Sequence, residues 1–272
     1  MIKKILFVML LMTFESCSDA QIVLNSQFEK DVFNTRVKLV DEFMLRFNGE
    51  KITAEIDTTR ENYRLLNLIS LFDAQMFGSK NGKDSLFKEA QNFATDVLKS
   101  NVKIDYADTN WVAVAPCRGK LKGKAVDFIV CLTVECRGKN MYKWVIDKVI
   151  GDVFSIEPNN KSVNAMISPD DHETNFMTLN HITTSDKDYI TAYKQKDYKL
   201  DQTMVFFTLV KNGLLTIDYV KGLQFEFFQI PGWRFSITEF DRTTMNSGWL
   251  ITSFSKMESK EKEDYLRSLY NK

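Results

Sequence analysis

Histidine, proline and glycine are all scarce in this chain. Among its 272 residues there are two histidines, four prolines and eleven glycines. Two histidines argue against a histidine-based zinc site or catalytic triad. The few prolines and glycines leave no Pro-rich or Gly-rich linker between domains. We therefore expect no metal and no cofactor.

The chain also lacks an excess of either charge. Lysine plus arginine and aspartate plus glutamate both number 36, so the sequence offers no electrostatic footprint for nucleic acid or anionic lipid. Apolar residues make up 44% and charged residues 26%, which is typical of a folded globular protein. The 21 phenylalanines favour large cores. The length suits one large domain or two of ordinary size.

One long apolar run is present, at the N-terminus. Lys3 and Lys4 precede the apolar residues 5–12. This run is shorter than the roughly 20 residues that cross a bilayer, and it matches a secretory signal in size and charge. No other segment approaches membrane-spanning length. The sequence therefore predicts a signal peptide over residues 1–20 and a soluble domain exported to the periplasm or cell envelope.

Two cleavage sites fit this leader. Ser18 and Ala20 place small residues before Gln21, as conventional signal peptidase requires. Cys17, which follows Ser16 just after the apolar run, resembles the loose lipobox of Bacteroidetes lipoproteins, although Phe14 and Glu15 depart from that pattern. The second interpretation makes Cys17 a lipid attachment site and a possible outer-membrane anchor, which would be the protein's only contact with a membrane.

The first half reads as helices followed by strands. Apolar spacings of three and four predict helices, and alternation predicts strands. The expected helices are 25–47, 58–76 and 84–98, with a short strand at 51–56. The expected strands are 111–117, 126–136 and 141–150, the first two joined by a hairpin turn at 121–124.

The second half repeats this order after a polar boundary at 159–162. Helices are expected from Ser168, over 186–196 and over 200–211, and strands at 214–220, 223–230, 233–240 and 249–254. Ser255 with Glu258 suggests a capping box for a last helix. We accordingly predict two α+β domains, 21–160 and 161–272, whose helices pack on curved antiparallel sheets.

The two halves also share residues where helix gives way to sheet. Ile104-Asp105-Tyr106 has a counterpart in Ile217-Asp218-Tyr219. Together with the long first helix, the strand that carries Trp144 and the closing strand from Gly248 to Ile251, this order resembles the NTF2-like, or SnoaL-like, cone fold. The resemblance implies a pocket between helices and sheet in each of two tandem units, and it brings no catalytic motif.

Carboxylates at those junctions are the first candidates for chemistry. Asp105 with Tyr106, and Asp218 with Tyr219, would transfer protons if they lay at the mouth of a pocket. The alternative is a solvated turn aspartate beside a half-buried tyrosine. Residues 170–173, an acidic run that includes His172, are explained by helix capping. His172 and His181 lie nine residues apart with no third ligand at a suitable spacing, so we expect no zinc site there.

Cysteines and aromatic residues are the remaining candidates. Cys117 and Cys131 would pair across the first hairpin if its loop had three or five residues, which leaves Cys136 as a free thiol. Buried structural cysteines are the favoured interpretation. The aromatic set Phe225, Phe227, Phe228, Trp233 and Phe235 is a candidate lining for a ligand groove. It includes both faces of a strand pair, however, so packing within a core or between domains is the expected role.

No catalytic constellation emerges from these patterns. We therefore expect an exported binding or interaction module without enzymatic activity, whose partner is an unknown small ligand or envelope protein. The alternative is a hydrolase or isomerase that uses Asp105 or Asp218 as general base. An assembly component, recognisable by a broad exposed aromatic surface, is a third class.

Overall fold

The computed structural model describes residues 36–50, 63–77, 83–139, 141–155, 167, 179–185, 187–195, 197–198, 201–243 and 245–270. Its α-helices are α2 (Val40–Asn48), α3 (Tyr63–Ser70), α4 (Lys83–Ser100), α6 (Gln202–Lys211) and α7 (Ser259–Tyr270). Its 3-10 helices are η1 (Ala74–Phe77), η2 (Asp152–Phe154), η3 (Leu179–Thr183) and η4 (Lys187–Tyr193). Its strands are β1 (Arg36–Val37), β2 (Trp111–Leu121), β3 (Lys124–Gly138), β4 (Met141–Ile150), β5 (Leu215–Val220), β6 (Gln224–Phe227), β7 (Trp233–Phe240) and β8 (Ser247–Lys256). The α+β class predicted from the sequence is confirmed.

All strands of the described residues belong to one mixed sheet. Their order is β1-β8-β7-β6-β2-β3-β4, and β5 pairs with β2 beside β6. The hairpin between β2 and β3 turns on Lys122 and Gly123, both with left-handed backbone (φ 49° and 80°). Such a two-residue loop matches the twist of the strands it joins, and the predicted turn is confirmed.

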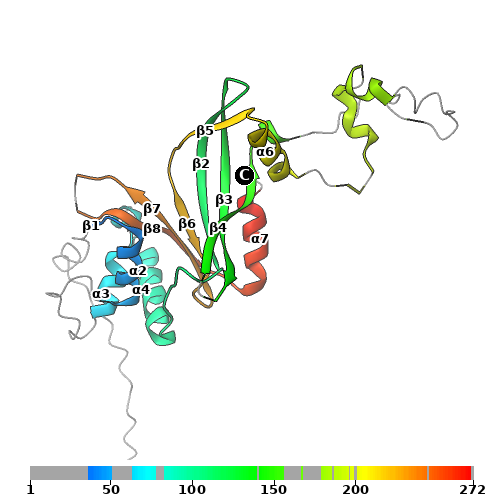
Figure 1. Ribbon diagram of the computed structural model, residues 1–272. Helices are drawn as coiled ribbons and strands as arrows, with labels where there is room; N and C mark the ends of the chain where they lie inside the picture. Colours follow the sequence, from blue (N-terminus) through cyan, green and yellow to red (C-terminus); the bar gives the residue numbers. More distant parts are fainter. Residues whose placement is uncertain are drawn as a thin grey trace, which may run out of the picture.

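Strand β2 holds the two halves of the chain together. One edge of β2 pairs with β3, and its other edge pairs with β5 and β6, which come from the second half. The strands expected in two separate sheets therefore form one (Figure 1). This arrangement does not confirm two tandem domains, and the boundary expected at 159–162 lies outside the described residues.

Alternation along β2 divides its side chains between two faces. Trp111 and Ala113 belong to the main core with α2, α3 and α4, while Ala115 and Cys117 pack with Phe206 of α6 on the same face. Val112 and Val114 point the other way, toward α7. In Figure 1, α2, α3 and α4 gather beside β7 and β8, whereas α6 lies at the β4 end of the sheet.

Stacked phenylalanines fill the main core. Phe227 and Phe235 lie on neighbouring strands with ring centroids 4.7 Å apart, and Phe47 of α2 stacks on Phe235 at 5.3 Å. Phe93 of α4 meets Phe235 edge-on. Burying each such ring stabilises the fold by roughly 1.5–3 kcal/mol, so the helices are held to the sheet chiefly by these contacts.

The first predicted helix is wrong in part. Arg36 and Val37 form strand β1, parallel to β8, and α2 begins only at Val40. Gly248 makes this pairing possible, because a Cβ there would lie 1.8 Å from the carbonyl oxygen of Val37. The helix ends at Gly49 in left-handed backbone, as the sequence indicates.

The second predicted helix is interrupted before Met76. Helix α3 ends at Ser70, because Leu71 and Asp73 hydrogen-bond to Ile251 of β8 instead. Ile251 N donates to Leu71 O at 2.8 Å, and Asp73 N donates to Ile251 O at 3.0 Å. Pairing with a distant strand thus overrides local helical spacing.

In the second half, α6 and strands β5, β7 and β8 fall close to their predicted positions. The helix expected over 186–196 is the 3-10 helix η4. The last helix is capped by Glu258 together with Glu261: Glu261 Oε2 accepts a hydrogen bond from Glu258 N at 2.7 Å. The capping box predicted from Ser255 and Glu258 is therefore wrong. The strand expected at 51–56 and the start of the helix expected from Ser168 lie outside the described residues.

Candidate functional site

Asp105 occupies an exposed turn. Its Oδ1 accepts from Ala107 N at 2.9 Å, and its backbone N–H and carbonyl hydrogen-bond to the side-chain amide of Gln229 at 2.7 and 3.0 Å. Neighbouring Tyr106 donates its hydroxyl to Asp41 Oδ1 on α2. Burial and the adjacent Asp41 carboxylate raise the pKa of Tyr106. Asp105 therefore acts as a turn residue, and Tyr106 holds its proton firmly.

Asp218 and Tyr219 lie on β5, which pairs with the C-terminal part of β2. Asp105 lies before the N-terminal end of β2. Asp218 is exposed and faces Lys120 Nζ at 3.6 Å, and Tyr219 is exposed. The register shift between Arg118 and Gly119 leaves Asp218 as the extra residue of a bulge. The structure does not bring the two predicted pairs together, and it places neither carboxylate in a described pocket.

The candidate pairing of Cys117 with Cys131 does not meet its condition of a three- or five-residue loop. The hairpin loop has two residues, so Cys117 stands opposite Phe128 and Cys131 opposite Val114. The two thiols consequently lie on opposite faces of the sheet, and both are free and buried. Cys136 is free and exposed. Burial raises the pKa of Cys117, and burial with the charge of Asp147 raises that of Cys131 to about 12.

Cys17, the acidic run 170–173 and its His172 lie outside the described residues. Within the part that is described, no cluster of three or more His, Cys, Asp or Glu residues is placed to hold a metal ion. None of the described helices is long and apolar enough to cross a membrane.

The predicted aromatic set is divided between the faces of the sheet. Phe225, Phe227, Trp233 and Phe235 belong to the main core, and Phe228 packs beneath α7, where its ring meets Tyr265 at 5.9 Å. The prediction of residues from both faces is confirmed. Packing explains the position of these rings. Phe225 also belongs to a partly exposed aromatic surface, which is described below.

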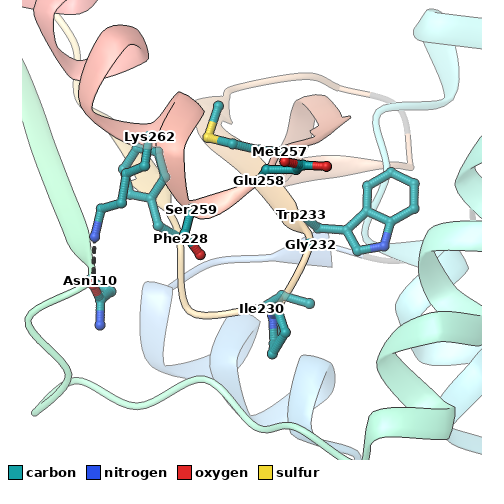
Figure 2. A pocket seen from close by; sticks show the side chains of 10 residues that line it. Asn110, Phe228, Ile230, Gly232, Trp233, Met257, Glu258, Ser259 and Lys262 are labelled. Atoms are coloured by element: carbon teal, nitrogen blue, oxygen red, sulfur yellow. Dashed lines mark hydrogen bonds between the residues drawn. The ribbon is translucent and has the colours of Figure 1, made fainter.

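A pocket of about 290 Å³ lies between the β6–β7 turn and the start of α7 (Figure 2). Its walls include Phe228, Trp233, Met257 and Lys262. Lys262 donates to Asn110 Oδ1, and Trp233 Nε1 donates to Asp96 at 3.1 Å. Because these polar groups already have partners within the chain, we interpret the pocket as the junction where α7 joins the sheet.

A buried polar cluster continues this junction along the same face. Glu226 of β6 is 1% exposed, and Arg234 of β7 lies 3.7 Å from its carboxylate. Arg234 also donates to Ser253 Oγ at 3.0 Å and Tyr265 Oη at 3.2 Å, with its guanidinium over the Tyr265 ring. The cluster therefore links strands β6, β7 and β8 to α7 and holds this helix in place on the sheet.

A different group of aromatic residues remains partly open. On the main-core face, Trp111 of β2 pairs with Phe227 of β6. On the other side of β2, Val134 of β3 pairs with Trp144 of the edge strand β4. Trp144 reaches over Val134 to meet Trp111 edge-on, with ring centroids 4.5 Å apart. Phe225 lies 5.3 Å from Trp111.

Half-exposed rings surround this contact. Trp144 is 39% exposed, Tyr142 precedes it by two residues on the same face of β4, and Tyr106 meets Trp111 edge-on at 5.7 Å. We call Tyr106, Trp111, Tyr142, Trp144 and Phe225 the aromatic platform. Leu132, Ile146 and Leu223, half-buried, separate it from the cluster under α6. The platform thus presents a rigid apolar surface on this face of the sheet, between helices α2, α3 and α4 on one side and α6 on the other.

One polar atom of the platform stands out. Trp111 is 1% exposed, and its Nε1 has no hydrogen-bond partner among the described residues. A buried donor in this state costs about 1–3 kcal/mol, and most buried polar groups in native proteins are paired. The platform therefore combines exposed rings with an unsatisfied buried donor.

Sequence reasoning did not single out the platform as a site. The alternation of Tyr142, Trp144 and Ile146 predicted one face of a strand, and nothing in the sequence indicated that this strand would be an edge. Trp111 was assigned to the first strand, with no sign that it would meet Trp144.

Over the described residues, fold and surface define an α+β protein with one mixed sheet, helices on both faces and an exposed aromatic platform. Comparisons with protein-family models, with curated proteins and with solved structures find no match for this chain. The resemblance to NTF2-like proteins therefore stays a prediction.

Proposed function

We propose that this protein is an exported, non-enzymatic binding module that holds its ligand against the aromatic platform. The observation that carries the proposal is Trp144, which is half-exposed yet supported from beneath by the buried Trp111. Large rings that are held rigidly lose little conformational entropy on binding and contribute much contact area. The platform has both properties.

The chemistry of the platform indicates the class of ligand. Tyr106, Tyr142 and Trp144 offer ring faces with polar edges. They suit a ligand with a flat apolar face and polar rim, such as a sugar ring of a glycan.

Isothermal titration calorimetry with a panel of neutral oligosaccharides tests this proposal. We expect binding that is lost in Trp144→Ala and retained in Tyr219→Ala, a matched removal of an exposed ring on β5. Circular dichroism checks that both variants fold. Binding that survives Trp144→Ala would place the ligand elsewhere, and a panel without any response would contradict the glycan class.

The enzymatic alternative loses its support in geometry. Asp105 is engaged in a turn with Gln229, and Asp218 is exposed beside Lys120. A general base works best when its surroundings shift its pKa toward the working pH, and neither position offers an enclosed site. Asp105→Asn and Asp218→Asn would abolish any hydrolase or isomerase activity that used these groups.

Export and lipid anchoring remain part of the proposal. The charged and apolar run before Cys17 supports them. Cys17→Ala should release the protein from membranes if Cys17 carries the lipid. A protein that fractionates identically before and after the change would contradict lipidation, and one retained in the cytoplasm would contradict export.

The two NTF2-like units are likewise proposed and rest on the repeated order of helices and strands. Any duplication must have merged its sheets, because β2 pairs with strands of both halves. A crystal structure in which residues 21–160 and 161–272 superimpose would support this origin. Halves that share no common topology would contradict it.

A further inference from the structure

Helix α6 carries an apolar stripe on its exposed side. Met204, Phe207 and Val210 are 62%, 45% and 43% exposed, while Thr203 and Phe206 of the same helix are buried. From Gln202 to Val210 the helix has no charged residue. A surface helix ordinarily presents polar residues to solvent, and a helix that is apolar all round is ordinarily covered. This composition indicates that a second surface covers α6.

The stripe continues onto neighbouring residues. Leu214 follows the helix, and Ile217 and Val220 of β5 stand opposite Gly119 and Cys117, on the face against which α6 packs. We call Met204, Phe207, Val210, Leu214, Ile217 and Val220 the α6 patch; all six are exposed. At roughly 200 Å² for a complete large side chain, they expose on the order of 500 Å² of apolar surface. Two such patches in contact would bury about 1,000 Å², the lower limit for a specific interface.

The spacing of the stripe is symmetric about Phe207. Met204 precedes Phe207 by three residues and Val210 follows it by three. In an antiparallel pair of α6 helices related by a two-fold axis at Phe207, Met204 of each copy meets Val210 of the other. We propose that the α6 patch binds a second copy of this chain in this way and forms a homodimer.

Charges at the ends of α6 favour the antiparallel arrangement. Asp201 caps the N-terminus, where its side chain accepts from Thr203 N at 2.9 Å, and Lys211 is in the last turn. Antiparallel packing brings each Asp201 toward the Lys211 end of the partner helix and places the two helix dipoles antiparallel, with the N-terminus of one beside the C-terminus of the other. Nearby Asp218 and Lys221 are already paired within the chain, with Lys120 and Asp127. The charged border of the patch therefore does not repel a second copy.

Disulfide trapping tests the proposed axis directly. In full-length protein carrying Cys17→Ala and Cys136→Ser, Phe207→Cys should form a covalent dimer under mild oxidation. The matched control is Thr208→Cys, an adjacent exposed position whose hydroxyl donates to Met204 O at 2.9 Å and lies off the stripe. It should cross-link poorly. Equal cross-linking of both positions, or none at position 207, would overturn the proposed axis.

Light scattering after size exclusion gives the second readout. The wild-type protein should be a dimer, and Phe207→Glu and Met204→Glu should each weaken the dimer about tenfold or more. Tyr198→Glu, at another exposed aromatic residue, should leave it intact. Circular dichroism confirms that each variant folds. A monomeric wild type or a dimer that survives both glutamate substitutions would overturn the proposal. So would a finding that the protein's own chain covers the α6 patch and keeps chemical reagents from reaching it.

Discussion

The ring of Trp144 lies against that of Trp111 at an interplanar angle of 60°, across the intervening strand β3. One ring is half-exposed and the other is buried, so Trp111 supports a surface that Trp144 presents. Their contact joins the main core to the edge of the sheet. A substitution at the buried Trp111 should therefore also disturb the exposed part of the platform.

Substitution of Trp111 separates its packing from its unpaired N–H. Trp111→Ala should lower the free energy of unfolding by about 3–5 kcal/mol, as expected for a large core ring. Trp111→Phe should cost clearly less, because it keeps most ring contacts and removes a buried donor without a partner. Urea denaturation measures both values. Equal costs would mean that the N–H is satisfied in solution.

Asp73 should make stability depend on acidity. It forms two hydrogen bonds with Arg242, at 2.8 and 2.9 Å, that tie the turn after α3 to the β7–β8 hairpin. Burial alone would raise the pKa of Asp73, but the hydrogen bonds from Arg242 and Gln75 and the charge of Arg242 outweigh it, so the pKa lies below its ordinary value of 3.8. Asp73→Asn should therefore cost about 1.5–3 kcal/mol at neutral pH.

The pH dependence of that cost follows from the lowered pKa. The contribution of Asp73 is fully present above the pKa of the unfolded chain and disappears as pH falls below 3.8 through the folded pKa. Denaturation series of wild type and Asp73→Asn should converge in acid. Asp264→Asn, at an exposed position on α7, serves as the control and should change stability by a few tenths of a kcal/mol. Parallel curves at all pH values would contradict this role of Asp73.

Tyr265 should affect stability at high pH. Burial and the charge of Glu226 raise the pKa of Tyr265 from 10.0 to about 12. Since the unfolded chain loses this proton first, the contribution is complete below pH 10 and is lost as pH rises toward 12. Wild type should therefore lose more stability over that interval than Tyr265→Phe. Tyr219→Phe, at an exposed ring, should follow wild type.

Thiol accessibility should distinguish the three described cysteines. A thiol reagent should modify Cys136 readily in the folded protein, whereas Cys117 and Cys131 should react only after unfolding, because both are buried and have raised pKa values. Mass spectrometry after alkylation identifies the sites. A bridge between Cys117 and Cys131 in non-reduced protein would contradict the strand register.

Expression of the first half alone tests whether it is a separate domain. Residues 21–160 contain β2 but lack β5, β6, β7 and β8. The fragment would expose the edge of β2 and remove much of the phenylalanine core, so we expect it to aggregate or remain unfolded. Cooperative unfolding of the isolated fragment would instead support two tandem domains.

Local patterns in the sequence were enough to predict many elements. Alternation located β2, β3 and β4, and the Lys122–Gly123 turn fixed their hairpin. Apolar spacing located α4 and α6. These elements form where sequence periodicity and backbone geometry agree. By contrast, Arg36 and Val37 follow a helical pattern but pair with β8, because a distant strand supplies their hydrogen bonds.

The sequence by itself determined the α+β class, most strand positions and the absence of an obvious catalytic motif. Only the tertiary structure decided that strands from both halves share one sheet, since hydrogen bonding between strands far apart leaves no local signal. It likewise placed Cys117 and Cys131 on opposite faces and brought Trp144 against Trp111. Register and edge position depend on which strands meet, and those two properties created the aromatic platform.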